Sequence, residues 1–331
     1  MKYNTIQSAL TEHRNRFMLK RIILLTVLAF GFFAMAAFGQ SPDPKPRVRT
    51  VTIPISIFTK KEIKENQPEE FVQADQLMVK EDRDDQQILS IRSVSDSPLS
   101  VAFLIQEDLA SSFNLQIKDI QDFIKGLPER SRVMIAYSRS GTIQVAQRFT
   151  DDRNRAAKSL RVVASSSSMA PRSPYDGVQE VLKKFDGVPA GRRAILLFSD
   201  GLDTSEGLSL ASTTQSFELD QAILKAQRQG TAVYAFYSPT TTTQEGNSIF
   251  INAAQGALNK LAHETGGRAF FQGTMAPVSY LPFFREMVIA LNRQFALTYL
   301  STHMNKGYHK VVVQSTNPEI RIDHPKGYYY R

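Results

Sequence analysis

The stretch that decides the fold is VAFLIQEDLASSF, from Val101 to Phe113. Its first five residues are apolar without a break, and Gln106, Glu107 and Asp108 follow them directly. A continuous apolar run of this kind is typical of a strand that is buried on both faces of a parallel sheet. The polar residues behind it therefore mark the carboxyl end of a buried strand, where ligands bind in open α/β sheets.

Strand and helix patterns alternate over about 200 residues around this stretch. Ala194–Phe198 and Val233–Tyr237 are two more continuous apolar runs. Between the runs, apolar residues recur at three- and four-residue spacings, which predicts helices with one buried face. The predicted fold class is α/β: a doubly wound, mostly parallel sheet with helices on both faces, of the Rossmann-like kind.

The flanks of this region have a different pattern. VTIPISIF, QLMVKED and QQILSIRSVS, all within residues 48–97, alternate apolar and polar residues and predict strands of a partial sandwich. The tail alternates in the same way, and its Asn305-Lys306-Gly307 turn predicts a β-hairpin followed by one more strand. We expect both flanks to pack together as one small β-sheet unit.

The beginning of the chain has the pattern of a secretory signal. A basic segment precedes the apolar run from Ile22 to Phe38, and small residues close it. An uncleaved membrane anchor is the alternative, and Met18 is an alternative start to Met1. The predicted parts of the chain are a signal peptide or anchor at 1–39, a linker at 40–50, a β-unit at 51–97, an α/β domain at 98–295 and a C-terminal β segment at 296–331.

Composition excludes several classes of protein. Of 331 residues, 42% are hydrophobic and 22% are charged, which fits neither a disordered chain nor a polytopic membrane protein. Residues 1–39 hold five Lys or Arg and one Glu, so without them the net charge falls from +8 to +4. A high net positive charge would have been the main indication of nucleic-acid binding, and half of it belongs to residues 1–39. The absence of cysteine excludes thiol catalysis and Cys-based zinc sites.

Several segments resemble one known family. In chain order they are RFTDDR, YDGVQEVL, RRAILLFSDGLDTSEG, LAHETGGRAFF and the tail FALTYLS…KGYHKVVVQS…KGYYYR. Together, over roughly residues 50 to 331, they resemble the von Willebrand factor A-related acidobacterial domain family. The resemblance implies a von Willebrand A-like fold with a metal-ion-dependent adhesion site. In the family this site uses D-x-S-x-S after the first strand, a Thr before the third helix and an Asp after the fourth strand.

The match to that metal site is incomplete. Asp200 stands where the family has the Asp after the fourth strand. Gln106 stands at the first Asp of D-x-S-x-S, with Asp108 and Ala110 at its two serines. Arg172 stands at the Thr position. A neutral amide, a methyl group and a positive charge would all weaken binding of Mg²⁺ or Ca²⁺, which prefer oxygen ligands.

Three arrangements of this site remain open. In the first, the site is degenerate or absent, and Arg172 pairs with Asp200 in place of the cation. In the second, the motif is aligned two residues further along the chain, so that Asp108, Ala110 and Ser112 occupy its ligand positions. A shift of two leaves each residue on the same side of the strand. Mg²⁺ or Ca²⁺ would then bind weakly through Asp108, Ser112 and Asp200. The third is some other arrangement of the same edge.

The predicted function is that of an exported, non-catalytic protein-interaction protein of the adhesion type, without a tightly bound cofactor. It would be periplasmic, envelope-associated or extracellular, and would meet a membrane only through an uncleaved N-terminal segment. A protein partner would bind at four loops: Gln106–Ser112, Ser165–Ser173, Ser199–Gly207 and Thr240–Asn247. The candidate residues are Asp200, Asp108 and Ser112 for a metal, and Gln106, Ala110, Arg172 and Ser173 for the ligand edge.

Two alternative functions are also compatible with the sequence. A metal-dependent hydrolase could use Asp108, Glu107 and Asp200, but no base with an orienting partner has a recognisable spacing. A purely structural envelope protein would keep the fold and lose the ligand site. Four of the five histidines share no metal-ligand spacing and predict no site of their own; they are His263, His303, His309 and His324.

Overall fold

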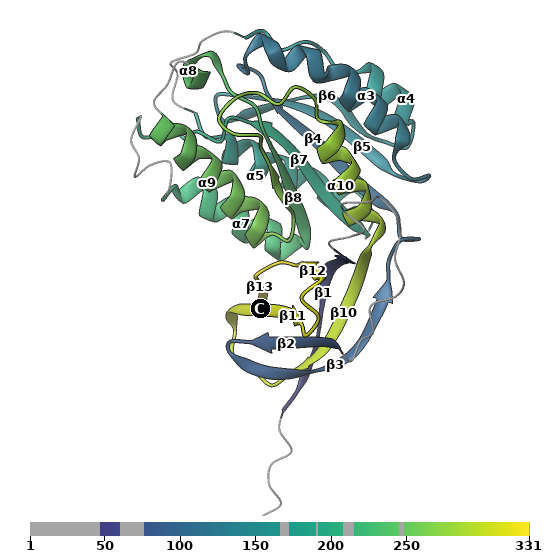
Figure 1. Ribbon diagram of the computed structural model, residues 1–331. Helices are drawn as coiled ribbons and strands as arrows, with labels where there is room; N and C mark the ends of the chain where they lie inside the picture. The colour runs from purple at the N-terminus through teal and green to yellow at the C-terminus, as the bar shows by residue number, and fades with distance from the viewer. Residues whose placement is uncertain are drawn as a thin grey trace, which may run out of the picture. The chain divides into compact units, whose positions relative to one another are not determined.

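The computed structural model (Figure 1) describes residues 47–59, 76–165, 172–189, 191–207, 215–244 and 248–330. The chain divides into two compact units, 1–47 and 48–331, and every described helix and strand belongs to the second. The predicted signal peptide or anchor lies outside the described residues, as does most of the predicted linker. Among the helices that the structure does describe, none is long and apolar enough to cross a membrane.

One sheet of the second unit has seven strands, and each neighbouring pair is antiparallel. It curls strongly on itself in Figure 1. Its strands, in spatial order, are β12 (Ile320–Asp323), β1 (Arg49–Thr59), β10 (Gln294–Ser301), β3 (Asp84–Ser93), β2 (Leu77–Glu81), β11 (Gly307–Ser315) and β13 (Gly327–Tyr330). Strands from the N-terminal flank and from the C-terminal tail are therefore neighbours in one sheet.

The other sheet has six strands and is mixed. Four neighbouring pairs are parallel, and β5 and β6 are antiparallel. Its strands, in spatial order, are β6 (Thr142–Thr150), β5 (Arg132–Arg139), β4 (Leu99–Gln106), β7 (Arg192–Ser199), β8 (Thr231–Tyr237) and β9 (Ala269–Phe270).

The predicted fold class, a doubly wound, mostly parallel and Rossmann-like sheet with a small β-unit, is wrong for this chain. The antiparallel sheet has seven strands and the mixed sheet has six, so the antiparallel sheet is larger than the predicted small β-unit. The six-stranded sheet is mixed because Ser140 and Gly141, with φ of 48° and 76°, form a tight turn between β5 and β6. A turn this short can only join antiparallel strands.

The predicted hairpin in the tail is also wrong. β10 and β11 follow each other in sequence but are not neighbours in the sheet. β10 lies between β1 and β3, while β11 lies between β2 and β13. Both hydrogen-bonding edges of β10 are taken by strands from the N-terminal flank, so no edge remains for β11.

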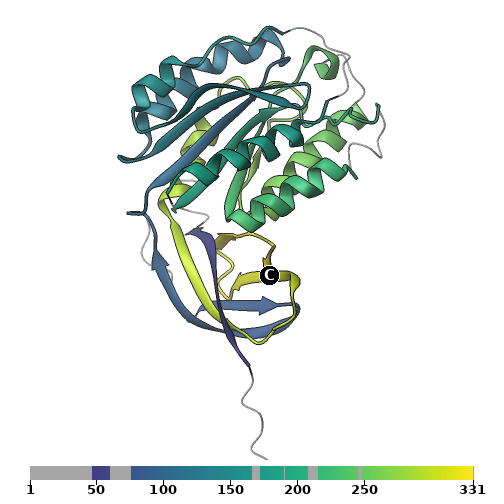
Figure 2. The same cartoon turned by 180° about the vertical axis from the view of Figure 1, so that it is seen from behind.

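Helices cover both faces of the six-stranded sheet, as Figures 1 and 2 show together. One apolar core packs α3, α4 and α10 against the sheet, and a second core packs α5, α7 and α9 against the opposite face. A third core lies within the antiparallel sheet. The helical segments are η2 (Ser111–Gln116), α3 (Ile117–Gly126), α4 (Arg153–Lys158), α5 (Pro174–Lys184), η3 (Phe185–Gly187), α7 (Phe217–Gln229), α8 (Thr241–Gln244), α9 (Ser248–Glu264) and α10 (Leu281–Asn292).

Candidate functional site

The candidate site lies where the two central strands of the mixed sheet end. β4 and β7 are parallel neighbours, with Ile105 opposite Phe198, so the residues that follow both strands meet at one edge. Gln106 ends β4, and Asp200 directly follows β7. The side chain of Asp200 is fully buried. A buried carboxylate at this edge requires partners that compensate its charge.

Arg172 is the cationic partner of that carboxylate. Its Nη2 lies 3.0 Å from Oδ2 of Asp200, and its Nη1 lies 3.2 Å from Oδ2 of Asp108. One guanidinium therefore joins the ends of β4 and β7. The structure contains the pairing that the first of the three arrangements describes.

Gln106 reinforces the same arrangement through its amide. Nε2 donates to Oδ1 of Asp200 at 3.1 Å and to Oδ1 of Asp108 at 3.0 Å. Oε1 accepts from the Ser199 hydroxyl at 2.5 Å and from the backbone N–H of Asp200 at 3.3 Å. An aspartate here would offer no N–H donor, and it would add a third carboxylate beside the other two.

The remaining acceptor capacity of Asp200 is also used. The Thr240 hydroxyl donates to its Oδ2 at 3.0 Å, and the backbone N–H of Leu202 donates to its Oδ1 at 3.1 Å. Burial raises the pKa of Asp200, while the Arg172 guanidinium lowers it and the Asp108 carboxylate raises it. Asp200 is thus held by charge and by four side-chain and backbone donors: Arg172, Gln106, Thr240 and Leu202.

A second buried carboxylate, Asp203, lies beside this centre. The hydroxyl of Ser173 donates to its Oδ2 at 2.9 Å, and the Ser216 hydroxyl donates to the same oxygen. Ser205 donates to its Oδ1 through both its backbone N–H and its hydroxyl, at 3.0 and 2.6 Å. Asp203 and Thr240 lie within two of the predicted loops, but neither residue was predicted to have a role of its own. The spacing of two carboxylates in SDGLD was the available signal for Asp203.

Two predicted site residues lie apart from this arrangement. Ala110 is buried, and its backbone N–H donates to the carbonyl of Pro239 at 2.9 Å. Ser112 lies in η2, and its buried Oγ has no hydrogen-bond partner in the part of the chain that the structure describes. Of the four predicted loops, residues 166–171 and 245–247 lie outside the described ranges.

The open space at this edge is small. A cleft of about 30 Å³ lies between residues that follow β4, residues at the β5–β6 turn and the start of α5. It has room for about two water molecules. Glu107 lines it but is paired with Arg161, whose guanidinium stacks 4.1 Å from the ring centre of Tyr137. Among the described residues, the cleft presents no histidine that could act as a base.

Comparisons with known proteins find similarity among solved structures. No protein-family model and no curated protein matches the chain. Among solved structures, it is similar to an aerotolerance-related membrane protein from Bacteroides fragilis, at 14% identity and a TM-score of 0.40, over 59% of this chain and 98% of that one. It is also similar to the conserved hypothetical protein BatB from Bacteroides thetaiotaomicron, at 12% identity and a TM-score of 0.41. That match covers 59% of this chain and 96% of BatB.

A third similar structure is the vWF domain of the type V pili tip protein Mfa5 from Porphyromonas gingivalis. It matches at 12% identity and a TM-score of 0.39, over 58% of this chain and 94% of that one. Similarities with identities and TM-scores this low carry no conclusion about function. The chemistry of the site has to come from the chain's own residues.

Proposed function

We propose that this chain is an exported, non-catalytic interaction protein, in which a von Willebrand A-like region binds a protein partner without a metal ion. The observation that carries the proposal is the Arg172 guanidinium between Asp108 and Asp200. In the family that the sequence resembles, a divalent cation occupies this edge. Here an arginine of the same chain supplies the positive charge.

The oxygen donors at this edge do not fit a tightly bound Mg²⁺ or Ca²⁺. Such ions take at least six oxygen ligands, of which carboxylates and hydroxyls of the protein supply part and water the rest. Gln106 points its Nε2 at both carboxylates and uses its Oε1 for Ser199. Ala110 has no side-chain oxygen, and the Arg172 charge would repel a cation. The affinity for a partner would therefore come from the edge loops rather than from a shared metal ion.

The test is a titration of MgCl₂ and CaCl₂ into the full chain while its thermal unfolding is followed. We expect no stabilisation of the natural protein. The triple variant Gln106→Asp, Ala110→Ser and Arg172→Thr, which restores oxygen ligands at three of the family's positions, should gain a dependence on Mg²⁺, since a ligand that binds the folded state at 100 Kd stabilises by about 2.7 kcal/mol. Arg139→Ala, an exposed arginine on the same cleft, is the matched control and should gain none.

Two results would overturn the proposal. One is a clear stabilisation of the natural chain by Mg²⁺ or Ca²⁺ that Asp200→Asn removes, because the edge would then hold a metal. The other is turnover of simple esters or phosphates that is lost in Asp200→Ala, because the edge would then be catalytic.

A further inference from the structure

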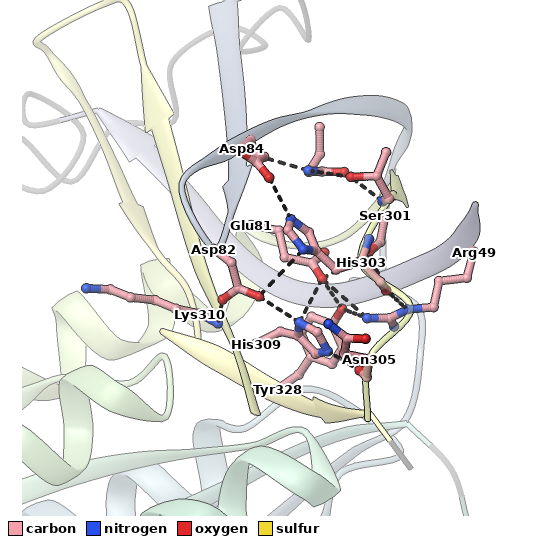
Figure 3. Close-up of polar contacts among 12 residues, drawn as sticks. Arg49, Glu81, Asp82, Asp84, Ser301, His303, Asn305, His309, Lys310 and Tyr328 are labelled. Carbon is pink, nitrogen blue, oxygen red and sulfur yellow. Dashed lines mark hydrogen bonds and ion pairs between the residues drawn. The ribbon is translucent and has the colours of Figure 1, made fainter. Parts of the chain in front are cut away.

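A second polar cluster lies in the antiparallel sheet, on the turn between β2 and β3 and on strands from the end of the chain (Figure 3). Glu81 is the last residue of β2, Asp82 lies in the turn that follows it, and His309 comes from β11. One potential ligand atom from each of these three side chains lies within 4.8 Å of the others. The cluster belongs to a different sheet from the Arg172 centre, so its chemistry is independent of the proposed function.

The ring of His309 has a defined orientation. Its Nε2 lies 2.7 Å from the backbone carbonyl of Asn305, and a carbonyl can only accept, so Nε2 carries a hydrogen. Its Nδ1 lies 2.8 Å from Oδ2 of Asp82 and 3.3 Å from Oε1 of Glu81. A neutral ring in this tautomer would point a lone pair at two carboxylates. His309 Nδ1 therefore needs either a hydrogen or a metal ion between itself and the two carboxylates.

Glu81 adds an independent indication. Its side chain is fully buried. Oε1 accepts from the hydroxyls of Ser301 and Tyr328, at 2.9 and 2.8 Å, and from Nη2 of Arg49 at 3.3 Å. Oε2 is also buried, and it has no hydrogen-bond partner among the residues that the structure describes. A buried carboxylate oxygen without a donor is costly, and a cation bound by both oxygens of Glu81 would reduce that cost.

His303 lies on the open side of the cluster, outside the group of three possible ligands. His303 Nδ1 lies 4.0 Å from Oδ2 of Asp82, and His303 Nε2 lies 3.2 Å from Oδ2 of Asp84. The side chains of Asp82 and His303 are 35% and 22% exposed, so an ion could enter from solvent on this side. The other oxygen of Asp82 accepts from the backbone N–H of Lys310 at 2.8 Å, which orients the carboxylate.

The charges of the cluster also favour a divalent cation. Glu81, Asp82 and Asp84 are three carboxylates, and Arg49 is the one guanidinium paired with them among the described residues. Two negative charges therefore remain, and a divalent ion would neutralise them.

We propose that Glu81, Asp82 and His309 form a site for a divalent transition-metal ion of the Zn²⁺ class, with water completing the coordination of the ion. Imidazole nitrogen together with carboxylate oxygen suits Zn²⁺ better than Mg²⁺ or Ca²⁺, which prefer oxygen alone. The Nε2–H of His309 on a backbone carbonyl is the usual outer contact of a metal-bound histidine. The hydrogen bonds from Arg49, Ser301 and Tyr328 would orient the Glu81 carboxylate in the same way.

The experiment uses the full chain, stripped with a chelator and dialysed. ZnCl₂ is titrated into it in a calorimeter, and CoCl₂ is titrated in parallel with the visible absorption of Co²⁺ as a spectroscopic readout. We expect one ion per chain, and binding at least tenfold weaker in Asp82→Asn, which keeps the size of the side chain and the acceptor for Lys310. His309→Gln should weaken binding similarly. His263→Gln, an exposed histidine on α9, should bind as the natural chain does.

Three outcomes would refute the site. The first is absence of Zn²⁺ binding in the folded natural chain, which would leave a proton between His309 and the carboxylates. The second is binding that Asp82→Asn leaves unchanged, which would place the ion elsewhere. The third is equal affinity for Ca²⁺ and Zn²⁺, which would contradict the nitrogen ligand. Circular dichroism of each variant shows that it is folded, so a weaker affinity can be assigned to the lost ligand.

Discussion

Arg172 shows how a single side chain can set the properties of the strand edge. Its side chain is 9% exposed and contacts carboxylates that follow two different strands. Without it, the fully buried Asp200 would keep its hydrogen-bond donors and lose the opposite charge. Removal of one partner from a buried ion pair is costly because the other charge remains in a medium that solvates it poorly.

We therefore expect Arg172→Ala to lower the free energy of unfolding by about 3–5 kcal/mol. Urea denaturation of the full chain, followed by circular dichroism, would measure the change. Arg139→Ala removes an exposed arginine from the same cleft and should change stability by less than about 0.5 kcal/mol. Equal, small effects of the two substitutions would mean that the pair with Asp200 contributes little.

The sequence raised this pairing as one arrangement among three, because Arg172 stands at the position of the family's Thr. It included Thr240 and Asp203 in predicted loops without assigning either a contact. Thr240 follows β8, forty positions away from Asp200, and only the order of strands in the sheet brings its hydroxyl to the carboxylate.

At the scale of elements, β7 can end in this site because Gly201 turns the chain immediately after Asp200. Gly201 has φ of +72°, and a Cβ there would lie 2.6 Å from Cγ of Leu258 and 2.7 Å from the carbonyl oxygen of Ala254. The close approach of α9 and the left-handed backbone both favour glycine at this position. The carbonyl of Gly201 also accepts from the Tyr175 hydroxyl at 2.9 Å, which ties the turn to α5.

Gly201→Ala should destabilise the chain by about 2–4 kcal/mol, from backbone strain and overpacking against α9. Gly256→Ala is the matched substitution within α9, where a Cβ would meet nothing within 4 Å. It should stabilise by about 0.5–1 kcal/mol, because alanine is the better helix former. Denaturant midpoints of the two variants would check both signs, and a stabilised Gly201→Ala would contradict the packing described for this turn.

At the scale of the whole 48–331 unit, direct contacts join the segment between β12 and β13 to the segment between α9 and β9. The backbone N–H of Lys326 donates to the carbonyl of Glu264 at 3.1 Å, and Thr265 and Pro325 form an antiparallel bridge. Arg268 pairs with Asp323 through Nη2 at 2.7 Å. These contacts hold the tail of the chain against the helical region.

His324 lies inside this junction in its neutral form. Its Nε2 accepts from the backbone N–H of Val313 at 3.2 Å, and its Nδ1 donates to the carbonyl of Pro325 at 2.9 Å. Burial lowers the pKa of His324 to about 4, and the nearby Lys326 contributes to the same shift. In the unfolded chain the same group has a pKa of about 6.5.

The free energy of unfolding should therefore fall as the pH falls from about 6.5 to about 4. In this range His324 is protonated in the unfolded chain and neutral in the folded chain. The His324 contribution to this loss is about 3 kcal/mol. Urea denaturation at a series of pH values would measure it. His324→Gln keeps an acceptor for Val313 and should make the loss shallower, whereas His263→Gln, at an exposed site, should change it less. An unchanged pH dependence in His324→Gln would contradict the assignment.

The sequence by itself determined which segments are buried strands and amphipathic helices, because uninterrupted apolar runs and three- to four-residue spacings are local properties. It also placed Gln106, Asp108 and Asp200 at strand ends. Only the tertiary structure decided how the strands pair. Arg49 and Tyr328 lie 279 positions apart and hydrogen-bond to each other and to Glu81, and no local pattern indicates such a contact. The same holds for the cluster around His309, since its ligand spacing exists in the folded sheet and not along the chain.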